Sequence, residues 1–188
     1  MFRLTQGFYY LFLGTWLGAL VMLALAAAIT FHTLRDLKAT TAVEPYHSLS
    51  AAEQPSALAG AVVGNVLHGL AVVQVVCAVG AVGCILLQHT VWAGHLAGGR
   101  AAPANITRLI LLALPVLILL LDVAVISPRI WQQRDLMYDP HRPAELRQAA
   151  RQRFDRLHHL DERVVGGATV ALAAGILVSG FAFRDPEQ

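Results

Sequence analysis

Long stretches without a charged side chain are the feature that most constrains this chain of 188 residues. Three contain no charge, and a fourth contains one aspartate, Asp122. The stretches lie between Arg3 and Arg35, Glu53 and Arg100, Arg108 and Arg129, and Arg163 and Arg184. About 20 apolar residues cross the hydrocarbon core of a bilayer as a helix. Because only 14% of all residues are charged, against roughly 25% in soluble domains, a soluble globular domain is excluded.

These stretches predict an all-α polytopic membrane protein, a four-helix up-down transmembrane bundle that forms a single integral membrane domain over residues 1–188. The spans are expected at about residues 7–32, 57–89, 106–127 and 164–183. Pro115 predicts a kink in the third span, and Pro128 is expected to end that span. A capping-box pattern from Ser50 to Glu53 predicts a helical turn before the second span.

The second stretch is longer than one crossing requires, and it has two interpretations. One tilted helix extends to about His89 and continues as an amphipathic extension through Trp92 and His95. Alternatively, two spans are separated near residues 80–83. The second alternative would carry Gln88, His89 and His95 across lipid, where burial of polar groups is costly. We therefore expect a single helix.

The segment before the fourth span predicts an amphipathic basic helix at about residues 143–163. Pro143 suits the first turn of a helix. Apolar side chains then recur at spacings of three and four, at Leu146, Ala150, Phe154, Leu157, Leu160 and Val164. No helix-breaking residue separates this segment from the fourth span. We therefore expect one long helix with a cytoplasmic extension before the last span.

The distribution of basic residues predicts the orientation. Residues 127–163 contain eight arginines, and the loop after the first span adds Arg35 and Lys38. The opposite side has four basic residues, which are Arg3, Arg100, Arg108 and Arg184. The positive-inside rule then predicts that both termini are periplasmic. Thirteen arginines against one lysine indicate a GC-rich bacterial genome, so the expected location is a bacterial inner membrane.

Asp122 is the acid inside the third predicted span, six residues before Pro128 and therefore about 9 Å from the end of that span. Matching depths in an up-down bundle places several polar residues at a similar level, with His158 and His159 just outside; they are Thr30, His32, Asn65, His68 and Thr169. An ionised aspartate without a partner costs a few kcal/mol at this depth, so we expect Asp122 to be neutral or partnered. His68 and Asn65 are the expected partners.

Two interpretations of this polar group remain open. In the first, one satisfied polar contact fixes the register of the helices. In the second, a polar pocket binds or transports a small ligand, a proton or a cation; its candidate residues are Asp122, Asn65, His68, His32 and His158. The leading functional hypothesis is therefore a binding or transport-type membrane protein. The alternatives are a haem- or copper-associated membrane protein, either an oxidoreductase or a permease, and a structural subunit of a membrane complex.

The arginines of the amphipathic helix also have two interpretations. Arg147, Arg151 and Arg156 are either topology determinants or a surface for anionic lipid headgroups. Binding of nucleic acid is not expected, because Asp155, Asp161 and Glu162 are interspersed among the basic residues.

Small residues repeat every four positions in three spans, at Gly14 and Gly18, at Gly60 and Gly64, and at Gly167, Ala171, Gly175 and Ser179. In lipid, close approach through small residues drives helix packing. This pattern predicts packing within one bundle, with a homodimer as the alternative. Cys77 and Cys84 are seven residues apart on one helix, too far for a disulfide, and are expected to be buried small hydrophobic residues.

The sequence contains no recognisable catalytic motif or metal-ligand spacing. Four histidines lie in or beside the spans, at His32, His68, His89 and His95, and none pairs with another at i, i+4. We therefore predict no cofactor, although axial haem ligation from two helices needs no spacing. An enzymatic activity is not expected.

Several short motifs occur in an order that resembles the transmembrane protein 205-like family. They are residues 16–18 (WLG), 31–34 (FHTL), 59–64 (AGAVVG), 127–130 (SPRI) and 154–158 (FDRLH). The resemblance covers nearly the whole chain and implies a four-helix integral membrane protein with a conserved domain of unknown function. Family members usually follow the last motif with a small polar residue and an asparagine; Asp161 and Val165 occupy those places here. More distantly, the layout is similar to copper-resistance D-type proteins and haem-containing membrane protoporphyrinogen oxidases.

Overall fold

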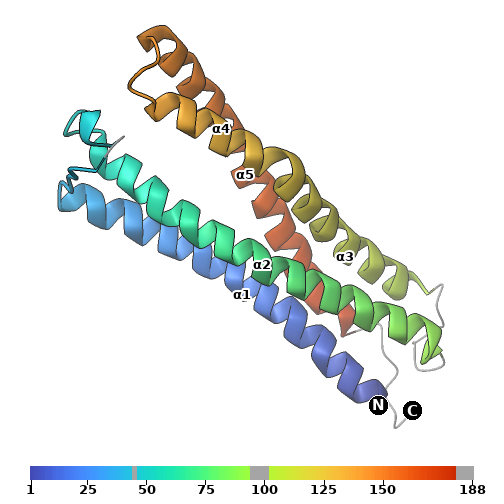
Figure 1. The fold of residues 1–188 in the computed structure, drawn as a ribbon. Helices are drawn as coiled ribbons and strands as arrows, with labels where there is room; N and C mark the ends of the chain where they lie inside the picture. Colours follow the sequence, from blue (N-terminus) through green and yellow to red (C-terminus); the bar gives the residue numbers. More distant parts are fainter. Residues whose placement is uncertain (44–45, 94–101, 181–188) are drawn as a thin grey trace. The chain divides into compact units, whose positions relative to one another are not determined.

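The computed structural model describes residues 1–43, 46–93 and 102–180, and every regular element in these ranges is helical (Figure 1). The elements are α1 (Phe2–Asp36), the 3₁₀ turn η1 (Tyr46–Ser48), α2 (Gln54–Thr90), α3 (Pro103–Leu121), the π-helical turn η3 (Asp122–Ile126), α4 (Ser127–Tyr138) and α5 (Ala144–Ser179). The prediction of an all-α membrane fold is confirmed. Four helical runs in the described residues are long and apolar enough to cross a membrane: α1, α2, the run from Pro103 to Tyr138, and α5.

Two expectations about helix continuity are confirmed. The second helix runs from Gln54 to Thr90 without a break at residues 80–83. The fifth runs from Ala144 to Ser179 as one helix, because nothing interrupts it between Pro143 and its apolar half. Ser50 Oγ donates a hydrogen bond of 2.8 Å to Glu53 Oε2, so the two residues of the predicted capping box contact each other through their side chains in the turn before α2.

Two boundaries differ from the predictions. Pro128 does not end the third helix, which continues through η3 and α4 to Tyr138. The expected extension of α2 through Trp92 is wrong, since the backbone N–H groups of Val91 and Trp92 both bond to the carbonyl of Leu87 and close the last turn. His95 lies outside the described residues.

The chain divides into two compact units, each containing a segment of all four long helical runs. Unit 1 comprises residues 1–21, 72–120 and 164–188. Its core takes side chains from α1, α2, α3 and α5; its members are Tyr9, Leu13, Trp16, Leu20, Cys77, Ala78, Ala81, Cys84, Ile85, Leu112, Leu119 and Leu172. Trp16 Nε1 also donates to Gln74 Oε1 at 3.1 Å, a polar link between α1 and α2. Large apolar side chains cover the outside of this unit, as a lipid-facing surface requires; they include Val72, Val79, Leu117, Leu120, Val170 and Leu177.

Unit 2 comprises residues 22–71 and 121–163. Its helices are joined by both apolar and polar contacts. Trp131 of α4 lies against Gly64 of α2, where an added Cβ would be 2.5 Å from the indole. Arg151 of α5 donates to Glu53 at the start of α2 over 2.8 Å. Ala57 and Ala59 of α2 are buried, together with Ile126, Met137 and Ala150.

Candidate functional site

Asp122 opens the π-helical turn η3 in unit 2. The backbone N–H of Ser127 donates to the carbonyl of Asp122, which is the i to i−5 bond of a π-turn. The hydroxyl of Ser127 also donates to Oδ1 of Asp122 at 2.8 Å. Pro128 follows directly and has no backbone N–H, so it cannot supply a bond that a regular α-helix would need there. The π-turn therefore lets the helix continue past Pro128, and the Ser127 hydroxyl holds the Asp122 carboxyl within the same turn.

A second carboxyl group meets Asp122 from α5. The carboxyl group of Asp161 on α5 lies close enough to that of Asp122 for the two charges to interact. An ionised carboxylate has no proton to donate. Two adjacent carboxylates also repel each other. Two carboxyl groups this close together are more stable when one of them holds a proton. Oδ1 of Asp161 is buried and has no hydrogen-bond partner among the described residues.

The charges around this pair come from the next turn of α5. The carboxyl group of Asp161 interacts with the charges of Asp122 and Glu162. Glu162 is half exposed, and two histidines contact its carboxylate. His158 Nε2 lies 3.4 Å from Oε1, and His159 Nδ1 lies 3.0 Å from Oε2. The carboxyl pair thus lies between helices, and an exposed His–Glu cluster adjoins it on the surface of α5.

The sequence-predicted pocket residues do not all gather at Asp122. The expectation that Asp122 has a partner is confirmed, but the hydrogen-bond partner is Ser127, and the carboxyl group of Asp161 lies nearby. Asn65 and His68 are exposed on α2, and no hydrogen bond or ion pair joins either to Asp122 within the described ranges. Ligand binding by Asn65 and His68 stays a prediction.

The two remaining predicted pocket residues have local partners. His32 Nδ1 is 2.8 Å from the Asp36 carboxylate one turn along α1. His158 joins the His–Glu cluster described above. Their binding roles are likewise untested, and the structure places only His158 on the same helix as a member of the carboxyl pair.

The three candidate headgroup-binding arginines differ in what they contact. Arg151 donates a hydrogen bond to the Glu53 carboxylate. This bond is the main cause that lowers the pKa of Glu53, and the hydroxyl of Ser50 is the next. Arg156 Nε donates to the carbonyl of Gln152 on its own helix. Arg147 is partly buried. Only Arg151 thus links α5 to the start of α2 by a described contact.

Sequence reasoning missed a buried polar cluster in unit 1. Arg108, Gln88 and Asn105 are 0% exposed. Arg108 Nη2 donates to Gln88 Oε1 at 2.7 Å, and its guanidinium lies 5.2 Å from the centroid of the Tyr9 ring. The signal was present, because Gln88 and Arg108 flank the loop between two apolar helices at similar distances from it. By its position in the sequence alone, Arg108 is a charge beside a span.

The small residues are divided between packed and open positions. Gly64 and Gly175 each face a side chain of another helix, Trp131 and Leu111, which supports packing within the chain. An added Cβ would meet nothing within 4 Å at four others, which are Gly14, Gly18, Gly60 and Gly167. Cys77 and Cys84 are buried free thiols, as expected.

Within the described ranges, no three His, Cys, Asp or Glu side chains gather as metal ligands. No family model matches the chain, and no curated protein or solved structure matches it. The interpretation of the carboxyl pair therefore depends on its own geometry and chemistry.

Proposed function

We propose that this protein binds and releases a proton at the Asp122–Asp161 pair, as the ion-binding site of a membrane transport protein. The closeness of the two carboxyl groups carries this proposal, because one bound proton removes the repulsion between them. Acidic residues within membrane-spanning helices are rare, and they commonly mark proton or ion pathways. The π-turn that begins at Asp122 adds support, since π-bulges occur frequently at functional sites.

Loss of the shared proton would leave two negative charges in contact. Repulsion between them disfavours that state, so deprotonation must either separate α5 from η3 or admit a cation in place of the proton. Ser127 restrains Asp122 through its hydroxyl, whereas Oδ1 of Asp161 has no described partner. We therefore expect α5 to be the element that responds to deprotonation. This is the coupling between ion binding and helix movement that a transport protein requires.

The topology that goes with this proposal is a bacterial inner membrane protein with periplasmic termini, supported by the excess of arginines in residues 127–163. The carboxyl pair would then open toward the cytoplasmic side. The resemblance to the transmembrane protein 205-like family agrees with the four-helix architecture. The open positions at Gly14 and Gly18 favour a homodimer through α1 as an additional proposal.

Infrared difference spectroscopy of the purified protein tests the shared proton directly. At neutral pH the wild-type protein should show the C=O band of a protonated carboxylic acid, and Asp122→Asn and Asp161→Asn should each lose it. Asp155→Asn is the matched control, because Asp155 is an exposed aspartate on α5. Absence of the band in the wild type, or its persistence in both pair variants, would overturn the proposal. In proteoliposomes with a pH-sensitive dye, Asp122→Asn should also abolish any proton flux that Asp155→Asn retains.

A further inference from the structure

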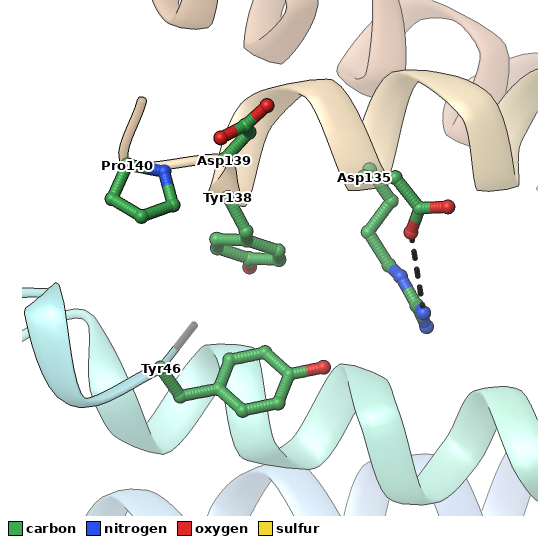
Figure 2. Close-up of a pocket in the computed structure, with 6 residues that line it drawn as sticks. Tyr46, Asp135, Tyr138, Asp139 and Pro140 are labelled. Atoms are coloured by element: carbon green, nitrogen blue, oxygen red, sulfur yellow. Dashed lines mark ion pairs between the residues drawn. The ribbon is translucent and has the colours of Figure 1, made fainter. Parts of the chain in front are cut away.

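A cavity of about 400 Å³ in unit 2 has no part in the proposed proton site. Its wall is formed by Tyr46, Arg134, Asp135, Tyr138, Asp139 and Pro140. Figure 2 shows Tyr46 on one side, with the ring of Tyr138 at the end of α4 opposite it and the Asp139 carboxylate pointing away from Tyr46. The cavity therefore lies between η1 and the C-terminal end of α4. Its volume falls within the range of small-molecule sites, about 300–1,000 Å³.

The positive group of the cavity is held in place before any ligand binds. The guanidinium of Arg134 lies 4.2 Å from the centroid of the Trp131 ring, and the Trp131 ring in turn packs on Gly64. Arg134 is also 3.6 Å from the carboxylate of Asp135, the ion pair drawn in Figure 2. A planar guanidinium held in this way is suited to bind a phosphate through two hydrogen bonds.

The opposite part of the wall is suited to a cation. The rings of Tyr46 and Tyr138 meet edge to face, with centroids 5.6 Å apart and planes at 71°. The backbone N–H of His141 and then the guanidinium of Arg142 lower the pKa of Asp139, so its carboxylate is ionised at neutral pH. Aromatic faces together with carboxylates attract ammonium groups. The cavity thus places the guanidinium next to the Asp135 carboxylate, and the tyrosine rings form a separate part of its wall.

The depth of the cavity matches that of lipid headgroups. Arg129 is the first charged residue after the apolar part of the third helical run, and Arg134 is five residues further along. A helix rises 1.5 Å per residue, so Arg134 lies about 7.5 Å beyond Arg129. The headgroup layer of a bilayer extends roughly 5–8 Å beyond the hydrocarbon core on each side. Trp131 and Tyr138 nearby are residue types that favour this layer.

We propose that this cavity binds the zwitterionic phosphoethanolamine headgroup of a membrane lipid. The phosphate binds the guanidinium of Arg134. The primary ammonium lies against the tyrosine rings and donates to the carboxylate of Asp135. A phosphatidylglycerol headgroup has no ammonium for this part of the wall. A phosphatidylcholine headgroup has an ammonium without N–H groups, so it cannot donate to this carboxylate.

Native mass spectrometry of the full-length protein in detergent, titrated with phosphatidylethanolamine, phosphatidylglycerol or phosphatidylcholine of equal chain length, tests the proposal. Phosphatidylethanolamine should bind about tenfold tighter than either of the others, a factor of the size that one charge-assisted hydrogen bond provides. Equal binding of phosphatidylglycerol would show charge attraction alone, and equal binding of phosphatidylcholine would show aromatic contact alone. Either result would overturn the assignment. Soluble O-phosphoethanolamine should compete weakly; affinity equal to that of the lipid would overturn the lipid as the source.

Variants locate the binding to the cavity. Arg134→Gln should weaken phosphatidylethanolamine binding about tenfold. Arg129→Gln is the matched control, an exposed arginine on the same helix that does not line the cavity, and should leave binding unchanged. Because Arg134 stacks on Trp131, its replacement also affects packing, so Tyr46→Leu in the 3₁₀ turn provides an independent test with the same expected direction. Unchanged binding in both Arg134→Gln and Tyr46→Leu would refute the site.

Discussion

Gly80 offers the sharpest test of how α1 and α2 pack in unit 1. A Cβ built on Gly80 would be 2.5, 2.5 and 2.6 Å from three atoms of the Phe12 ring, whereas ordinary Cβ contacts are 3.4–4 Å. Gly83, one turn along the same helix, has nothing within 4 Å of its Cβ position. Gly80→Ala and Gly83→Ala therefore make the same chemical change with and without a neighbouring ring.

The expected size of the difference follows from two opposing contributions. Replacing glycine by alanine within a helix stabilises it by roughly 0.5–1 kcal/mol, and both variants gain this equally. Forcing an extra carbon into a filled space costs about 1–3 kcal/mol, and only Gly80→Ala carries this cost. The free energy of unfolding of Gly80→Ala should therefore lie about 1–3 kcal/mol below that of Gly83→Ala.

Unfolding of the purified protein in mild detergent, titrated with a denaturing detergent, measures this difference. Phe12→Leu should relieve the crowding, so the cost of Gly80→Ala should shrink when Phe12→Leu is already present, as a double-mutant cycle measures. Equal stability of Gly80→Ala and Gly83→Ala would refute the packing of Phe12 on α2. So would a cost that stays the same in the Phe12→Leu background.

Two further predictions concern unit 2 and the buried thiols. Arg151 and Ser50 lower the pKa of Glu53. The partly exposed Glu53–Arg151 pair contributes up to about 1 kcal/mol of stability. This contribution is present above the unfolded-state pKa of Glu53 and is lost as the pH falls through its folded-state pKa. The unfolding midpoint of wild type minus that of Glu53→Gln should decrease over this acidic range, and a constant difference would contradict the prediction. Cys77 and Cys84 are buried thiols. A water-soluble maleimide should therefore label neither of them in the folded protein and both after denaturation. Rapid labelling of the folded protein would show that the core of unit 1 is open.

The helices could be predicted from the sequence because the bilayer core imposes a simple requirement on charge. Each of the four apolar stretches contains a long helical run in the described residues. The absence of a helix-breaking residue between Pro143 and Val164 predicts the continuous α5. The buried polar groups were harder, because their partners depend on which residues lie at equal depth. Gln88 was recognised as costly to bury, but its pairing with Arg108 required the exact length of the loop between their helices.

The partner of Asp122 was missed because the end of its helix was misplaced. With Pro128 taken as the end of the third span, Asp122 is matched in depth with residues of α1 and α2 and with Thr169 of α5. The actual turn contains Pro140 and Pro143, and Asp122 and Asp161 are nearly equidistant from His141 at its centre. In an antiparallel pair of helices, residues equidistant from the turn lie side by side. The proline pair was the available signal, and it pointed to Asp161.

The π-turn explains why no regular helical pattern could have placed these side chains correctly. In an unbroken α-helix each residue turns by about 100°, so Asp122 and Trp131 would point about 180° apart. The π-turn adds one residue without an added rotation, which reduces this angle to about 80°. Asp122 can then face α5 while Trp131 packs on α2. The 2.8 Å hydrogen bond from the Ser127 hydroxyl to Asp122 agrees with this, because residues five apart face each other only where the helix is widened in this way. The same turn that accommodates Pro128 therefore aims the acid at its partner.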